Sequence, residues 1–397
     1  MARNPSSAST ASGATAGPTP PAPVSAVLFF GFAVASIGGP IALVTLFPGT
    51  AGEAIDSAGL VVLVALALFT APLWVWLAYS RDIVSSGGLS AFVAASAGRR
   101  TALVHGWIWA FAYFLYLPYT VTFVVYDLLA PVFPGIDAYR SSLELVLPVA
   151  IVLLVLAPLR LVLAGLGVVA LAQIAAMLVL AAVVLSHTGA HVAARPEANG
   201  TAKAAAATAL LFICSSLALY LGAEVRGGSR TVRRGLVWAV ALVGGAFFVA
   251  AIPLSRVPDP IREAAVPGAS IAQAYGGRDL AVVVGLLTAA STLGLIVAEY
   301  LALARLLHWL HGPPVRSVLK WIAVPFIAAD AASLLDPNRF YDDLLEVSLA
   351  ALFVSQLMVF LAFPRYRRGA IAVGAAAVAS GLVAWGLWTL VAGSASS

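Results

Sequence analysis

Two carboxyl side chains lie inside long apolar runs of this sequence, away from the polar segments that separate the runs. Glu299 lies near the end of the run 280–304, and Asp330 lies inside the run that follows it. A charged carboxylate is costly in apolar surroundings, so such an acid usually holds a proton, contacts a cation or forms an ion pair. Glu299 is therefore a candidate proton carrier. The alternative is an ion pair with an arginine such as Arg81 or Arg305.

Two other apolar runs contain residues that interrupt a helix. The run 25–47 has at its centre Ser36, Ile37, Gly38, Gly39 and Pro40. Proline lacks the N–H of a helical residue and its ring clashes with the preceding turn, and glycine weakens a helix further. The run 204–222 has at its centre Ile213, Cys214, Ser215 and Ser216. Small polar side chains can satisfy freed backbone groups, although serines also serve helix packing. We interpret both centres as helix breaks at a binding site, and the alternative for the first is a simple proline kink.

Hydroxyl and aromatic side chains lie at mid-depth in two further runs. Thr288, Ser291 and Thr292 offer oxygen atoms, which suit a hard cation, but hydroxyls in apolar helices usually bond the carbonyl four residues earlier. Tyr113 and Tyr116 lie near the middle of the run 103–129. These two aromatic side chains either cap a bound molecule or pack between helices.

The amino-acid composition indicates what kind of structural element carries these side chains. Of the 397 residues, 62% are hydrophobic and 10% are charged, where soluble domains carry roughly 25% charged residues. Many apolar runs approach the ~20 residues that cross ~30 Å of hydrocarbon as a helix. The sequence therefore predicts an all-α integral membrane protein that is surrounded by a lipid bilayer.

Eleven membrane-spanning helices are predicted, and basic residues indicate their orientation. With the N-terminus in the cytoplasm, fifteen of the 22 Lys and Arg residues lie inside and seven outside. We therefore expect a multi-pass protein of the cell membrane with a cytoplasmic N-terminus and an external C-terminus. The predicted spans are 25–47, 58–79, 103–129, 143–157, 159–185, 204–222, 235–253, 280–304, 319–335, 344–363 and 370–392.

Several classes of function are not expected. The net charge of +5 does not indicate nucleic-acid binding, because the basic residues form short clusters between apolar runs. The single cysteine, Cys214, permits no internal disulfide, and no metal site or cofactor is predicted. An enzyme is not predicted either, because no loop is long enough for a catalytic domain and no nucleophile motif appears.

The two interrupted runs are spaced as in a repeat. Their centres, Gly38 and Ser215, lie 177 residues apart. Two five-helix halves, each beginning with a discontinuous helix, correspond to the inverted-repeat plan of secondary transporters. In that plan the backbone at Ile37 to Pro40 binds a carboxylate, and Ile213 to Ser216 contact an ammonium group. The predicted parts are a disordered cytoplasmic tail 1–24, a first repeat 25–187, a second repeat 203–363 and an extra C-terminal helix 364–397.

Four stretches carry a resemblance to a known family. They are 85–93 with the following 97–107, then 165–173, 224–235 and 304–313. In order and spacing they resemble motifs of the amino acid–polyamine–organocation (APC) superfamily of permeases, over about residues 25 to 365. Sodium-coupled relatives of this architecture use two adjacent hydroxyls, which here are Ser291 and Thr292.

The chain also departs from the pattern of that superfamily. The loop after the sixth span has Gly227 and Gly228 where the family has Asn-Pro. The sixth span has Cys214, Ser215 and Ser216 where the family often has Gly, an aromatic residue and Glu. The glycine motif of the first span is shifted toward Gly-Gly-Pro, and the usual twelfth helix is missing.

These observations predict a secondary active transporter that moves amino acids or related amines across the membrane by alternating access. Its partners are a small-molecule substrate and a coupling ion, H⁺ or Na⁺. The alternative is a transport-silent APC-like membrane sensor or partner subunit, which the missing acid of the sixth span favours.

Overall fold

The computed structural model describes residues 24–189 and 198–394, apart from 131, 134, 263 and 265. The predicted disordered tail lies outside the described residues except for Val24. The chain is nearly all helical, and ten of its described helical segments are long and apolar enough to cross a membrane. The predicted membrane class is thereby confirmed.

The first half of the chain begins with a broken span, formed by α1 (Ala26–Ala35) and α2 (Pro40–Ala51). The short helix α4 (Gly88–Ala97) follows the second span. The remaining elements of this half are η1 (Gly52–Ser57), α3 (Ala58–Tyr79), α5 (Arg99–Phe123), the π-helical turn η2 (Val124–Leu128), η3 (Ile136–Tyr139), α6 (Arg140–Leu156) and α7 (Leu159–Thr188).

The second half also begins with a discontinuous span, α8 (Ala198–Leu210) followed by the 3₁₀ segment η4 (Leu211–Glu224). The long helix α11 (Pro267–His311) has non-helical backbone angles at Gly277, which separates a short first part from the membrane span. The remaining elements are α9 (Gly228–Ala251), η5 (Ile252–Arg256), α10 (Asp259–Arg262), α12 (Val315–Ser333), α13 (Pro337–Tyr366) and the additional α14 (Ala370–Ser394).

The helix α12 is the predicted ninth span and is not one of these ten segments. It has 19 residues and contains Arg316, Lys320 and Asp330. At 1.5 Å per residue it is about 28 Å long, close to the ~30 Å of a hydrocarbon core. Counting α12 with the ten gives the eleven spans that the sequence predicts.

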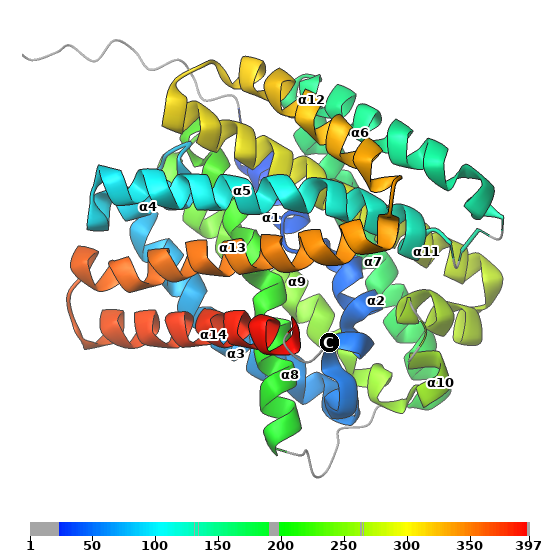
Figure 1. The fold of residues 1–397 in the computed structure, drawn as a ribbon. Helices are drawn as coiled ribbons and strands as arrows, with labels where there is room; N and C mark the ends of the chain where they lie inside the picture. The colour runs from blue at the N-terminus through cyan, green and yellow to red at the C-terminus, as the bar shows by residue number, and fades with distance from the viewer. Residues whose placement is uncertain are drawn as a thin grey trace, which may run out of the picture.

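The contacts between the two halves follow the same pattern in both directions. The third span of the first half, α5, packs against the fifth span of the second half, α13. Likewise the third span of the second half, α11, packs against the fifth span of the first half, α7. In the same way α1 packs against α9, and α8 packs against α3. The fourth spans of the two halves, α6 and α12, pack against each other, as Figure 1 shows. With five spans in each half, the second half must enter the membrane from the opposite side.

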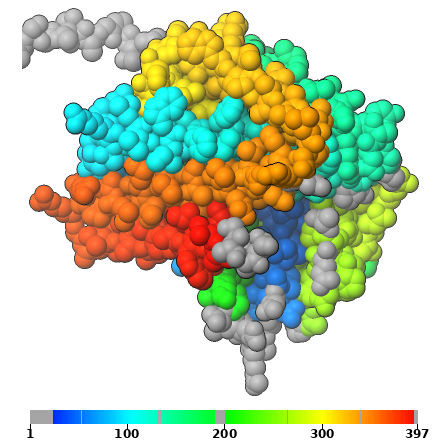
Figure 2. All heavy atoms as spheres, viewed as in Figure 1, coloured from blue at the N-terminus to red at the C-terminus, as the bar shows by residue number. Residues whose placement is uncertain are grey.

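The additional helix α14 covers one flank of this arrangement. It packs against α13 and α3, and α13 packs in turn against α5. Figure 2 shows α5, α13 and α14 as neighbouring bands on one face of the molecule. This helix therefore belongs to the packed body of the protein.

The start of the first span is joined to the end of the sixth. The Val24 N–H donates to Glu224 O (3.1 Å), and the Arg226 N–H donates to Val24 O (2.9 Å). These bonds satisfy backbone groups at helix ends that would otherwise lack partners. They tie the two discontinuous spans together at one end of the molecule.

Two glycines allow α1 and α7 to approach closely. A Cβ atom added to Gly31 would lie 2.8 Å from the Cα atom of Gly167. Small residues at such crossings permit backbone contact, which is a main source of helix association in membranes. The crossing places the broken first span against the fifth.

We predict that Gly31→Val destabilises the protein while Gly165→Val on the same helix pair does not. Valine at 31 must displace α7, and overpacking of this kind typically costs about 1–3 kcal/mol. A side chain at Gly165 meets no atom within 4 Å. Thermal unfolding of the purified protein in detergent measures both. Equal shifts in Tm for the two variants would contradict the close crossing.

Candidate functional site

The break in the first span depends on two left-handed glycines. α1 ends at Ala35 and α2 begins at Pro40, and the connection contains Gly38 at φ +58° and Gly39 at φ +70°. Residues with a Cβ atom rarely adopt such angles, whereas glycine does so readily. Pro40 then occupies the first position of α2, where no N–H is needed. The amide groups of the first turn of α2 are left without helical partners.

The connection packs directly on α11. A Cβ atom on Gly39 would overlap Ser291 Oγ, so only glycine fits against this serine. Ser291 Oγ donates to Gln173 Oε1 of α7 at 2.9 Å, and both side chains are buried. The break is thereby fixed between the fifth and eighth spans.

The two threonines of the proposed cation site bond mainly within their own helix. Thr288 Oγ1 donates to Val284 O (2.8 Å), and Thr292 Oγ1 donates to Thr288 O (3.0 Å). Thr288 Oγ1 also lies 3.4 Å from Thr45 Oγ1 of α2. Bonding to the carbonyl four residues earlier is the usual alternative to a role in binding sodium. A sodium role for these residues stays a prediction.

The sixth span changes its winding at the predicted polar centre. Residues Leu211–Glu224 form a 3₁₀ helix, and 3₁₀ stretches longer than a few residues are uncommon and often mark functional hinges. Ser215 Oγ donates to Phe212 O at 2.7 Å, and Ser216 Oγ accepts from Gln356 Nε2 of α13 at 3.3 Å. Both serines are fully buried.

A cavity of about 520 Å³ lies between the break, α5, η4, α11, α13 and α14. Six of the predicted site residues line it: Gly38, Tyr113, Tyr116, Ile213, Cys214 and Glu299. The others are buried and are not among its lining residues: Ser36, Ile37, Gly39, Pro40, Ser215, Ser216, Thr288, Ser291 and Thr292.

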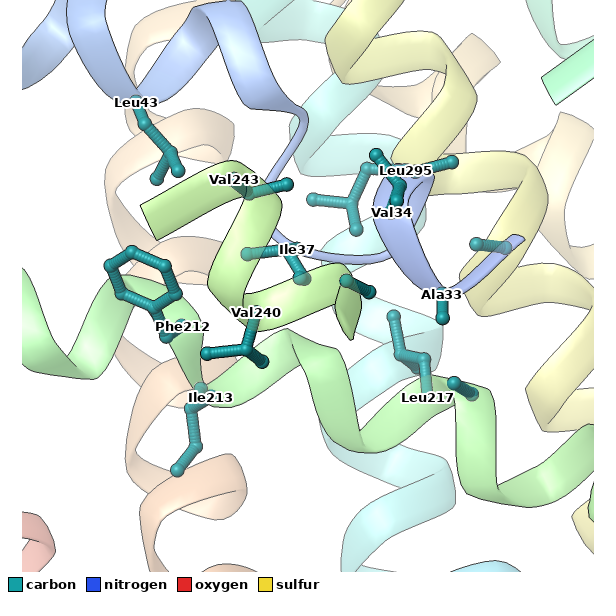
Figure 3. Close-up of a cluster of buried hydrophobic side chains, with 14 of the residues drawn as sticks. Ala33, Val34, Ile37, Leu43, Phe212, Ile213, Leu217, Val240, Val243 and Leu295 are labelled. Carbon is teal, nitrogen blue, oxygen red and sulfur yellow. The ribbon is translucent and has the colours of Figure 1, made fainter. Parts of the chain in front are cut away.

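Apolar packing holds the non-helical connection in place beside this cavity. Ile37 is fully buried and belongs to a cluster with Phe212 and Leu217 of η4, Val240 of α9 and Leu295 of α11 (Figure 3). Because this cluster joins residues of both halves of the chain, the break and the sixth span form one packed unit.

Glu299 is the acid in the wall of the cavity. Its side chain is fully buried, and neither carboxyl oxygen has a hydrogen-bond partner among the described residues. The carboxyl group interacts electrostatically with Tyr113, Tyr116 and Cys214. Arg305, one of the arginines considered as its partner, instead donates from Nε to Glu224 at 2.6 Å.

The polar corner around Glu299 is supported by an aromatic stack. Tyr113 Oη lies 4.0 Å from Cys214 Sγ, and its ring is 4.1 Å from that of Trp109. Trp109 in turn lies 4.3 Å from the ring of Tyr220 in η4. These contacts orient the Tyr113 hydroxyl toward the sixth span. The rest of the wall is mainly apolar, including Leu43, Leu46, Leu295, Leu349, Leu352 and Phe353.

Gln173, Trp385 and Thr389 belong to this region but are not among the site residues predicted from the sequence. Gln173 lies at the end of a stretch singled out only for its resemblance, and its contact with Ser291 joins residues 118 positions apart. Trp385 and Thr389 of α14 line the cavity, although this helix is predicted only as an addition. No local signal in the sequence indicates either contact.

Comparison with known proteins shows which solved structures have a similar fold. No protein-family model matches the chain, and no curated protein matches its sequence. Among solved structures, MhsT in complex with L-phenylalanine is 14% identical, with a TM-score of 0.63 over 91% of this chain and 97% of that one. The Eremococcus coleocola manganese transporter, in complex with an aromatic bis-isothiourea substituted compound, is 13% identical, with a TM-score of 0.59 over 93% and 87%.

These similarities, with the broken first and sixth spans, show a five-plus-five inverted-repeat fold. The chain is a multi-pass membrane protein that shares its fold with MhsT and with a manganese transporter. One of these structures is of a metal-ion transporter and the other holds L-phenylalanine, so the fold alone leaves the substrate class open. Membership of the APC superfamily stays a prediction.

We predict that Gly39→Ala destabilises the protein and that Gly49→Ala, in the same helix α2, does not. Alanine at 39 must adopt a positive φ and displace Ser291, and a strained backbone residue costs about 1–3 kcal/mol. Gly49 has no atom within 4 Å of an added Cβ. The midpoint of thermal unfolding tests this. An unchanged midpoint for Gly39→Ala would mean that the break can move freely away from α11.

Proposed function

We propose that this protein is a secondary active transporter that moves amino acids or related amines across the membrane by alternating access. The observation that supports this most is the central cavity between two discontinuous spans, with the unpartnered carboxyl group of Glu299 in its wall. We further propose that it lies in the cell membrane with a cytoplasmic N-terminus.

The chemistry around Glu299 suits an ammonium group. A buried carboxylate without a partner requires a cation, and the described cavity wall supplies none. Tyr113 and Tyr116 add aromatic faces and hydroxyl oxygens, which favour organic cations. The remaining apolar wall suits a hydrocarbon side chain.

The start of α2 suits a carboxylate. Gly38 and Ala42 line the cavity, and amide groups in the first turn of a helix are unpaired and carry partial positive charge. An amino acid therefore finds a complement for each of its charges. The volume of about 520 Å³ falls within the ~300–1,000 Å³ of small-molecule sites.

Glu299 also links transport to protons in this proposal. A proton neutralises the carboxyl group when the cavity is empty, and the ammonium group of the substrate takes that role when it binds. Because one carboxylate serves both cations, proton and substrate affinities are coupled. Sodium coupling through Ser291 and Thr292 is the alternative for the driving ion.

Uptake of radiolabelled compounds into proteoliposomes tests the proposal. We expect accumulation or exchange of at least one amino acid or amine in a broad panel. Glu299→Gln should lower the affinity for that compound at least about tenfold and remove the pH dependence of its uptake. The matched control is Glu346→Gln, which changes an exposed acid of α13. If uptake instead follows sodium and is lost in Ser291→Ala with Thr292→Ala, the coupling ion is sodium.

Two outcomes would count against transport. Saturable binding without uptake or exchange, by folded protein, would favour the alternative of a membrane sensor or partner subunit. No binding, uptake or exchange of any compound in the panel would contradict the proposed substrate class.

We predict that a bound substrate protects Cys214 from a small thiol reagent. Cys214 is the single cysteine of the chain, and it is half-buried in the cavity wall. A substrate that occupies the cavity blocks the approach of the reagent, so the rate of modification should fall several-fold at saturation. Mass spectrometry measures that rate, and Cys214→Ser gives the background. An unchanged rate at saturating substrate would place binding elsewhere.

A further inference from the structure

A second pair of buried acids lies outside the central cavity, between α6 and α12. The buried stripe of α6 consists of Glu144 with Pro148, Ile151, Val152 and Val155, and most of its other residues are exposed. On α12 the buried stripe ends with Asp330 and Ser333. Both acids are fully buried, and the two helices pack together. Each helix therefore presents its acid to the other and not to lipid.

Two hydroxyl groups bind one of the acids. Thr122 Oγ1 of α5 donates to Glu144 Oε1 at 2.5 Å. Ser333 Oγ lies 2.7 Å from the same oxygen and 2.6 Å from Asp330 O, so it joins the two acidic residues. Glu144 Oε2 and both carboxyl oxygens of Asp330 have no hydrogen-bond partner among the described residues.

Such a pair cannot be doubly charged without a cation. The two carboxyl groups interact electrostatically, and like charges in an apolar interface strongly disfavour each other. The Thr122 hydroxyl donates to Glu144 and stabilises a negative charge there, whereas the Asp330 carboxyl receives no donor. The favoured arrangement is an ionised Glu144 beside a protonated Asp330.

We propose that Glu144 and Asp330 form a proton-binding site between α6 and α12, separate from the central cavity. A proton from water attaches to the Asp330 carboxylate, and the pair then carries one negative charge in place of two. Both side chains are packed without exposure, and a proton requires no cavity of its own. The site does not depend on the proposed transport function.

A small cavity lies beside Thr122, next to this site. It has a volume of about 230 Å³ and is lined by Thr122, the residue that donates to Glu144. Its remaining lining residues are Tyr126, Asp127, Pro337, Tyr341 and Asp342.

The other charged or titratable groups near the pair have interaction partners other than the two acids. Arg140 of α6 pairs with Asp137 at 2.6 Å and lies over the ring of Tyr126 in η2. Tyr341 of α13 is hydrogen-bonded to Tyr119 of α5 at 3.2 Å. From α11, Tyr300 bonds Leu319 O of α12, about three turns before Asp330. None of these groups hydrogen-bonds to the two acids in the described part of the chain.

Infrared spectroscopy of the full-length protein in nanodiscs tests the site. The Glu299→Gln background removes the acid of the central cavity from the spectrum. We expect a band of a protonated carboxyl group at neutral pH that disappears at alkaline pH. Asp330→Asn should remove this band, whereas the control Asp127→Asn should keep it. Glu144→Gln should keep the band but move its disappearance to lower pH, because the neighbouring negative charge is gone.

Stability provides an independent measurement. The folded pair binds a proton that the unfolded chain releases at neutral pH, so stability should fall as pH rises. One proton changes the unfolding equilibrium by up to about tenfold per pH unit. Asp330→Asn, which has nearly the shape of the protonated acid, should flatten this dependence, and Asp127→Asn should not.

The proposal is overturned if Asp330→Asn leaves both the band and the pH dependence of stability unchanged. It is also overturned if Glu144→Gln leaves the band unmoved or shifts it to higher pH. If Na⁺ or Ca²⁺ stabilises the protein and Asp330→Asn abolishes that effect, the site binds a metal ion and not a proton. Because none of these measurements uses a substrate, their failure is independent of the uptake experiments.

Discussion

The contact between the Gly38–Gly39 connection and Ser291 is the constraint on which the central part of the structure depends. A broken helix inside a membrane must have its backbone groups enclosed by protein or by a polar cavity. Here glycine angles let α2 start against α11, and the Ser291–Gln173 hydrogen bond fixes α11 to α7 at the same level. The cavity lies between this connection with the start of α2 and the tightly wound η4, and both Glu299 and Tyr113 line it.

The buried acids of the chain have different surroundings and therefore different chemistry. Glu299 faces a cavity that a molecule can enter, with tyrosines and a thiol around it. Glu144 and Asp330 face each other in a packed interface, with hydroxyl donors on one member only. In low-dielectric surroundings each charge must be compensated nearby. The first site thus suits an organic cation or a proton, and the second, which is packed and fully buried, suits a proton.

Composition and helix breakers predict the architecture because they act locally. The apolar runs give the spans, and Gly38, Gly39 and Pro40 give the first break. The binding roles of the residues singled out from the sequence remain predictions. What the sequence does not reveal is how each helix is rotated and which neighbour it meets. Glu144 lies one residue inside the predicted span 143–157, where an acid usually reaches water. The contact of Gln173 with Ser291 and the place of α14 in the cavity wall depend on packing between distant segments.

The inverted repeat explains why the acid pair can form and why it lies near one end of the two helices. α6 and α12 are the fourth spans of oppositely oriented halves, so the start of α6 lies beside the end of α12. Acids at equivalent positions of the two halves would lie at opposite ends and never meet. Glu144 near the start of one helix and Asp330 near the end of the other do meet. The opposite end of α12 carries the exposed bases Arg316 and Lys320 instead. The pair therefore breaks the symmetry of the fold, and the proposed proton site lies near one end of the two helices.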